Sequence, residues 1–215
     1  TDLSLSGNKE LGGHFTQLSG WDALPKLERL ALPQTVTAND VRALFPAPSK
    51  ALRELVLTGA KALLTSPSAV LALAEAFTSL DLGLTAVGDD GWAELMSAPA
   101  LRRLVELHAN GCSLSDDAVE ALTTKGPSRL VTLDLSSNKL TDAGVTLLAE
   151  WPGLEHVTHL RLGNNRKVTA AGYRALLRAP SFSPATLDLG KVADVKLIAA
   201  LKERFGPTAV IASSK

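Results

Sequence analysis

Residues 130–150 read LVTLDLSSNKLTDAGVTLLAE, an extended segment followed by a helical one. Leu133 and Leu135 alternate with period 2, so both side chains leave the strand on one face and Asp134 lies on the other. Asn138 stands where the chain turns away, and its carboxamide can donate to and accept from backbone groups of a neighbouring unit. Apolar residues then follow at helical spacing and would pack back onto the strand. One such unit cannot enclose a core, so it must be stacked on others.

The paired leucines recur every 25–27 residues along the whole chain. The aligned pairs are Leu3/Leu5, Leu30/Leu32, Leu55/Leu57, Leu80/Leu82, Leu107/Ala109, Leu133/Leu135, Leu160/Leu162 and Leu187/Leu189. The asparagine position holds Asn8, Cys112, Asn138 and Asn165 in four coils, and Thr35, Ala60, Thr85 and Val192 in the others. A pattern repeated in eight registers predicts a solenoid in which each coil contacts its neighbours.

The repeat also predicts where the helices lie. We expect helices around 41–45, at about 68–77, from about 194 to 204, and one that carries Trp92, Leu95 and Met96. The fourth strand is predicted at 79–83, a poor first helix is interrupted by Gly12-Gly13, and residues 208–213 read as a final edge strand. Further helices are expected to start at Ser115, Thr141 and Thr169. Small residues recur on the first helical turn, where they would permit close approach of the adjoining loop: Gly91, Ala118, Gly144 and Gly172.

The pattern LxxLxLxxNxL, with LTDAGVTLLAE at 140–150, resembles the leucine-rich repeats of the ribonuclease-inhibitor-like class. The resemblance extends over nearly the whole chain and is weakest at 1–26, 58–70 and 190–215. Similar Ala- and Leu-rich arrays occur in large bacterial proteins. The resemblance implies an α/β fold: a right-handed solenoid of about eight coils, with a parallel sheet on the concave face and helices on the convex face. It also implies that the chain binds proteins.

We expect one leucine-rich repeat domain over residues 1–215, with 206–215 forming the C-terminal edge strand. Leu3 already belongs to a repeat, and no N-terminal cap precedes it. The chain is therefore predicted to be a piece of a longer protein. The open end predicts either an upstream segment packed against it in the full-length protein or end-to-end self-association of this piece.

Composition excludes several partners and folds. The chain has 22 Lys and Arg against 22 Asp and Glu, which argues against nucleic acid and anionic membranes as partners. A single cysteine excludes an intramolecular disulfide framework. The most apolar run, 69–74, is too short to span a bilayer, and no signal peptide is visible, so we expect a cytoplasmic protein.

The side chains that alternate with the leucines form two columns on the predicted concave face. The central column runs Ser4, Ala31, Val56, Asp81, His108, Asp134, Arg161 and Asp188, and the other includes Glu106 and His159. Charges alternate in sign from Asp81 to Asp188. This run predicts either a self-neutralising ladder of ion pairs or a recognition patch for a mixed-charge protein. The candidate partner-binding residues are Asp81, Glu106, His108, Asp134, His159, Arg161 and Asp188.

Metal and catalytic interpretations of the same residues are weaker. Asp81, His108 and Asp134, with Glu106 or His159, carry zinc-binding groups, but strand geometry spreads them along a line. Ser136 or Ser137 near His108 and Asp134 could form a nucleophile set, yet no nucleophile elbow, phosphate-binding loop or Cys/His cluster accompanies them. We therefore expect neither a cofactor nor an enzyme.

Other reactive or aromatic side chains have structural explanations. Cys112 aligns with the asparagines and is expected to be a buried thiol. Trp92, Trp151 and Tyr173 are expected in the core. The predicted function is a non-catalytic module that binds a protein through its concave face or rim loops. The alternative is a regulatory or architectural segment that positions a catalytic domain encoded elsewhere.

Overall fold

The computed structural model describes residues 1–8, 11, 14–18, 20–63 and 67–213. Within them, nine strands form one parallel sheet in sequence order. The strands are β1 (Asp2–Ser4), β2 (Arg29–Ala31), β3 (Glu54–Val56), β4 (Ser79–Asp81), β5 (Glu106–His108), β6 (Thr132–Asp134), β7 (His159–Arg161), β8 (Thr186–Lys191) and β9 (Val210–Ser213). This α/β leucine-rich repeat architecture confirms the predicted fold class.

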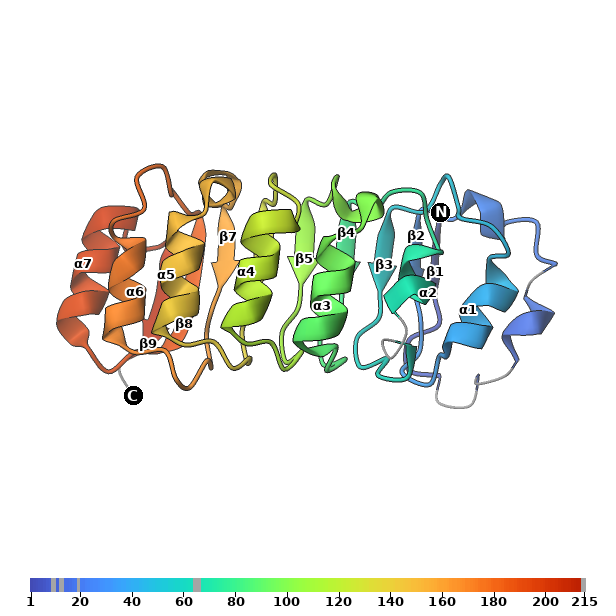
Figure 1. Ribbon diagram of the computed structural model, residues 1–215, viewed down its shortest axis with the longest axis horizontal. Helices are drawn as coiled ribbons and strands as arrows, with labels where there is room; N and C mark the ends of the chain where they lie inside the picture. Colours follow the sequence, from blue (N-terminus) through green and yellow to red (C-terminus); the bar gives the residue numbers. More distant parts are fainter. Residues whose placement is uncertain (9–10, 12–13, 19, 64–66, 214–215) are drawn as a thin grey trace.

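The α-helices lie side by side in a row on one side of the sheet (Figure 1). They are α1 (Ala38–Leu44), α2 (Pro67–Leu71), α3 (Gly88–Met96), α4 (Asp116–Lys125), α5 (Asp142–Glu150), α6 (Ala170–Leu176) and α7 (Val195–Phe205). Short 3₁₀ turns precede several strands: η1 (Phe15–Gln17), η2 (Leu24–Lys26), η4 (Pro99–Leu101) and η5 (Pro152–His156). We call the sheet face away from the α-helices the open face.

The strand leucines build the core between the sheet and the helices. Each pairs in register with the leucine of the next coil, from Leu3 against Leu30 to Leu160 against Leu187. From β2 to β8 the first leucine of each pair is at most 1% exposed. Trp92, Trp151 and Tyr173 are buried as predicted. Burial of a continuous apolar row is what holds the coils together.

The side chain at the asparagine position joins neighbouring coils by hydrogen bonds. Asn138 Oδ1 accepts the backbone N–H of Cys112 at 3.0 Å, and its Nδ2 donates to the carbonyl oxygens of Ala109 at 2.8 Å and Leu135 at 3.0 Å. Asn165 repeats the arrangement one coil later. The predicted use of this carboxamide is confirmed. These bonds satisfy buried backbone groups at the point where each coil turns.

Cys112 replaces an asparagine in this row. Its thiol is fully buried, and its Sγ lies 2.9 Å from the carbonyl oxygen of Leu82. Burial raises the pKa of the thiol and outweighs the hydrogen bond to Thr85 that lowers it. A thiol that stays protonated is a poor nucleophile. The structure thus agrees with a structural cysteine.

Ser115, Thr141 and Thr169 cap the helices α4, α5 and α6 as predicted, each accepting a backbone N–H two residues later. A second set of bonds, which the sequence did not reveal, links these caps to the preceding coil. An aspartate on the first turn of the preceding helix accepts hydrogen bonds from both the backbone N–H and the hydroxyl of each cap residue. The pairs are Asp89 with Ser115, Asp116 with Thr141, and Asp142 with Thr169.

The helix predicted at about 68–77 is wrong in length, because α2 ends at Leu71. Ser49 in the preceding coil donates its N–H to the Leu73 carbonyl and accepts the N–H of Glu75. This parallel bridge straightens the chain at 73–75, where a longer helix would need the same backbone groups. Tertiary hydrogen bonding therefore overrides local helical spacing.

The helix expected around 41–45 begins earlier than predicted, at Ala38. Thr37 caps it by accepting the N–H of Asp40, whose carboxylate accepts the Thr37 N–H in return. This reciprocal capping box satisfies two of the otherwise free N–H groups at the helix start.

At the C-terminal end, β9 pairs in parallel with β8, as expected for a final edge strand. The last two residues of the segment predicted at 206–215 lie outside the described residues, as do Gly12 and Gly13. None of the helices described is long and apolar enough to cross a membrane.

Candidate functional site

The register of the sheet brings the seven candidate residues onto five adjacent strands, β4 to β8. In the central column Asp81 pairs with His108, His108 with Asp134, Asp134 with Arg161, and Arg161 with Asp188. In the second column one threonine on β6 separates Glu106 from His159. Adjacent strands lie roughly 4.8 Å apart, so each side chain has neighbours on both sides.

Three aspartates of the central column are turned toward their own chain. Each Oδ1 accepts the backbone N–H two residues later, at 2.8 Å for Asp81 and Gly83 and at 2.9 Å for the other two pairs, Asp134 with Ser136 and Asp188 with Gly190. The strand β4 is predicted to extend to residue 83 but ends at Asp81, whose carboxylate accepts the Gly83 N–H. The signal was present in the sequence as an aspartate followed two residues later by glycine or serine, a turn-forming pattern.

The predicted ladder of ion pairs is wrong as a continuous feature. The structure shows one pair along this column, between Asp134 Oδ2 and Arg161 NH1 at 3.5 Å. Within the described chain no ion pair shorter than 4.0 Å joins His108 to Asp81 or Asp134, or Arg161 to Asp188. The carboxylates that would form those pairs are held by the local backbone instead.

The side chains of Glu106 and His159 make one hydrogen-bond contact each. Ser79 Oγ donates to Glu106 Oε2 at 3.2 Å, and Thr158 Oγ1 lies 2.9 Å from His159 Nδ1. Both contacts are exposed to solvent, where such bonds hold a side chain weakly. Among the hydrogen bonds and ion pairs of the described residues, His108 has no side-chain partner. Its half-buried imidazole therefore retains its hydrogen-bonding capacity.

Neither the metal nor the nucleophile arrangement assembles on this face. Across the part of the chain that the structure describes, no three His, Cys, Asp or Glu side chains come together in a way that could hold a metal ion. The Ser136 hydroxyl donates to Asp134 at 2.6 Å. No hydrogen bond in the described residues links Ser136 or Ser137 to His108, as a nucleophile and its base would require.

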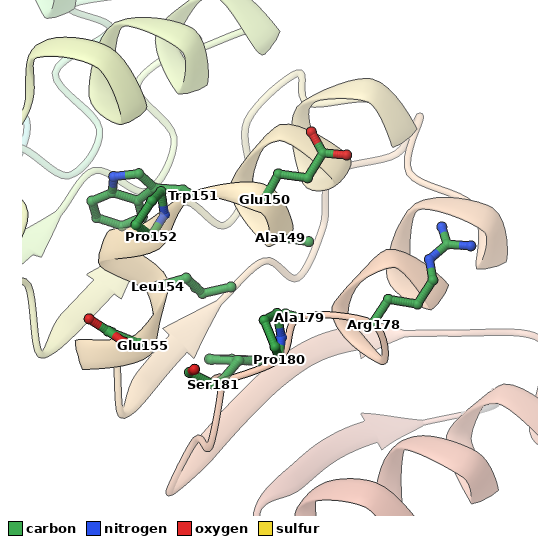
Figure 2. Close-up of a pocket in the computed structure, with 11 residues that line it drawn as sticks. Ala149, Glu150, Trp151, Pro152, Leu154, Glu155, Arg178, Ala179, Pro180 and Ser181 are labelled. Atoms are coloured by element: carbon green, nitrogen blue, oxygen red, sulfur yellow. The ribbon is translucent and has the colours of Figure 1, made fainter.

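Two grooves lie away from the seven candidate residues of the open face. One groove of about 420 Å³ lies between the segments that follow α5 and α6 and lead to the next strands. Figure 2 shows Trp151 and Leu154 on one side of it and Ala179 to Ser181 on the other. Glu150, Glu155 and Arg178 also line this groove. None of the seven candidate residues lines this groove.

A second groove, of about 650 Å³, lies at the turns that lead from β6 to α5 and from β7 to α6. We call it the turn-rim groove. It is lined by Ser137, Asn138, Lys139, Asn164, Arg166 and Lys167. The repeat pattern allowed for rim loops as a binding surface but did not point to these residues. Their signal is three basic residues at the same turn of two consecutive coils.

Comparison with known proteins supports the fold. A family model described as "Leucine Rich repeat" matches residues 128–149, the coil that carries β6 and α5. No curated protein matches the chain. Among solved structures, a chain from the crystal structure of the Rad7 and Elc1 complex in yeast matches with a TM-score of 0.59 and 19% identity.

The match to that yeast structure covers 94% of this chain and 60% of the other, so this chain spans about 60% of its length. At this identity the likeness concerns the fold alone. One coil matches in sequence, and nearly the whole chain matches in three dimensions. The chain therefore has the leucine-rich repeat fold.

Proposed function

We propose that this chain is a non-catalytic module that binds a protein partner through its open face. The proposed contact residues are the seven candidates on β4 to β8: Asp81, Glu106, His108, Asp134, His159, Arg161 and Asp188. The observation that carries the proposal is their placement together on the sheet face that the α-helices do not cover. Carboxylate, guanidinium and imidazole groups lie there on adjacent strands. Such a face fits a partner that presents both signs of charge.

Four of the seven groups on this face are also held in place before any partner binds. Backbone N–H groups fix the carboxylates of Asp81, Asp134 and Asp188. Arg161 is anchored by its pair with Asp134, although half of its side chain remains exposed. Less side-chain entropy is lost on binding when the contacting groups are already ordered.

The structural comparison supports a protein as the class of partner. The matched structure is of a complex between Rad7 and Elc1. Because this chain spans about 60% of the matched chain, that partner is not carried over. We also propose the ribonuclease-inhibitor-like subclass. The support is a repeat of 25–27 residues with an α-helix after each strand from β2 to β8.

The test begins with a photo-crosslinking residue in place of His108, which lies at the centre of the proposed surface. A protein captured there, and not from Glu120 on the exposed side of α4, identifies the partner. Its affinity is then measured for the Glu106→Gln, His108→Gln and Asp188→Asn variants, with Glu120→Gln as the matched control.

We expect each open-face substitution to weaken binding by about three- to tenfold, an effect that diminishes as salt rises. The free energy of unfolding should change little, because these side chains are not in the core. Unchanged affinity in all three variants, or an equal loss in Glu120→Gln, rejects the open face as the binding surface.

A further inference from the structure

We propose that the turn-rim groove binds an acidic segment of a protein partner. This surface is distinct from the open face, since none of the seven open-face candidates lines the groove. The proposal therefore adds a second contact with its own chemistry, and it stands or falls separately from the open-face proposal.

The first support is uncompensated charge. Lys139, Arg166 and Lys167 are all exposed and line one groove of about 650 Å³ that no Asp or Glu lines. In the described part of the chain, no carboxylate lies within 4.0 Å of their cationic groups. The whole chain carries equal numbers of acidic and basic residues, so this is a local excess. An anionic ligand would relieve the mutual repulsion of the three cations.

The second support is the rigid backbone beneath these cations. Ser137 and Asn164 have positive φ angles of 57° and 62°, which turn both loops in the same way. The Ser137 N–H donates to the Gly163 carbonyl at 2.8 Å, and Asn164 Nδ2 donates to Ser137 Oγ at 3.4 Å. Buried Asn138 also lines the groove. The two loops thus present their cations from fixed positions, which lowers the entropy lost on binding.

Nearby acidic groups are already engaged. Asp142, at the start of α5, accepts two hydrogen bonds from Thr169, both at 2.7 Å. Asp134, at the end of β6, is bonded to Ser136 and Arg161. Neither carboxylate lines the groove. The residues that line the groove therefore supply no counter-charge of their own.

The chemistry of the groove favours a short acidic peptide over a nucleic acid. Arg166 offers a planar fork that can hold a carboxylate with two hydrogen bonds, and the lysines add two point charges. Single-stranded nucleic acids are usually held on a longer basic track with aromatic side chains on which bases stack. The lining has no aromatic residue and covers two coils only.

The test measures fluorescence anisotropy of a labelled glutamate-rich peptide as the intact chain is added. The variant is Lys139→Gln/Arg166→Gln/Lys167→Gln. The matched control removes three exposed cations elsewhere on the chain, as Lys50→Gln/Lys125→Gln/Lys196→Gln. Both proteins lose the same net charge, and thermal unfolding checks that both remain folded.

We expect the groove variant to bind the peptide at least about tenfold more weakly than the control variant, with a steep dependence on salt. Glu106→Gln on the open face should leave this binding unchanged, which separates the two proposals. Equal affinities of the groove and control variants, equal binding of a glutamine-rich peptide, or equally tight binding of single-stranded DNA would each overturn the proposal.

Discussion

Asn138 shows how one side chain supports two coils. It is 9% exposed, and its carboxamide contacts backbone groups on its own turn and on the preceding one. An asparagine can do this because it carries both an acceptor and two donors on a short side chain. Cys112 holds the same place in the preceding coil. Its thiol, a weaker hydrogen-bond donor than an amide, contacts the Leu82 carbonyl oxygen.

We predict that Asn138→Ala lowers the free energy of unfolding by at least about 1–3 kcal/mol, because buried backbone groups lose their partners. Ser137→Ala should have a smaller effect, since Ser137 is exposed and its hydroxyl has one long hydrogen bond. Denaturant unfolding of both variants provides the measurement. Equal losses would mean that the carboxamide is not the link between these coils.

The single side chain of Asp142 makes the stability of the fold depend on pH. Burial alone would raise its pKa, but hydrogen bonds from the side chain and backbone of Thr169 and from the Gly172 N–H outweigh burial and lower it. A carboxyl whose folded pKa is depressed stabilises the fold above its unfolded pKa of about 3.9. That stabilisation is lost as pH falls through the folded pKa.

We therefore predict that Asp142→Asn is less stable than the wild type near pH 6, by about 1 kcal/mol. The difference should shrink as pH falls below about 4. Urea unfolding across this range measures it, with Asp117→Asn, an exposed aspartate on the first turn of α4, as the control. A difference that stays constant down to about pH 2.5 would contradict the assigned role of the ionised carboxylate.

At the scale of elements, the first turn of each helix packs closely against a small residue on the first turn of the next helix. A Cβ added to Gly144 would lie 2.1 Å from Asp116 Oδ1 but 3.5 Å from its Cα. A Cβ on Gly172 would lie 2.5 Å from Asp142 Oδ1 and 2.9 Å from its Cα. The predicted need for small residues is thus confirmed at both positions. At Gly144 the added Cβ would collide with a side-chain carboxylate, which can move. At Gly172 it would also collide with the backbone of Asp142.

We predict that Gly172→Ala is more destabilising than Gly144→Ala, by about 1–3 kcal/mol, because backbone cannot move aside as a side chain can. In an Asp116→Ala background the obstacle at residue 144 disappears. Gly144→Ala should then stabilise the protein by about 0.5–1 kcal/mol through helix propensity. Thermal or denaturant unfolding of the four variants tests both points. Similar effects at the two glycines would show that the backbone contact is relieved elsewhere.

Across the whole molecule, the coils differ in how much regular structure supports them. In the described part of the first coil, the 3₁₀ turns η1 and η2 lie behind the strand, and Leu3 and Leu5 are half-buried. The coils of α4, α5 and α6 have longer helices, the aspartate caps and the asparagine row. Because each coil contacts mainly its neighbours, local stability follows these differences.

We predict slower amide hydrogen exchange in residues 116–176 than in residues 24–45, measured by mass spectrometry at neutral pH. The aspartate caps and asparagine bonds must break before the later coils open, whereas the early coils lack most of them. Uniform protection along the chain would show instead that the solenoid opens as one cooperative unit.

The sequence by itself determined the strands, their register, the buried leucines and the capped starts of α4, α5 and α6. Each of these follows from a local period or from a residue's own hydrogen-bonding capacity, repeated every 25–27 residues. It also placed the seven candidate residues on one face, because side chains of a strand alternate with period 2.

Only the tertiary structure decided how side chains of different coils meet. The helix α2 ends where Ser49 bridges to the next coil, and an aspartate on the first turn of one helix accepts hydrogen bonds from the cap residue of the next. It also gathered Lys139, Arg166 and Lys167 into one groove. These outcomes depend on atomic distances and on competition for hydrogen bonds between residues far apart in the sequence, such as Asp142 and Thr169. A repeat pattern fixes which residues are neighbours, but not which of the available partners each side chain takes.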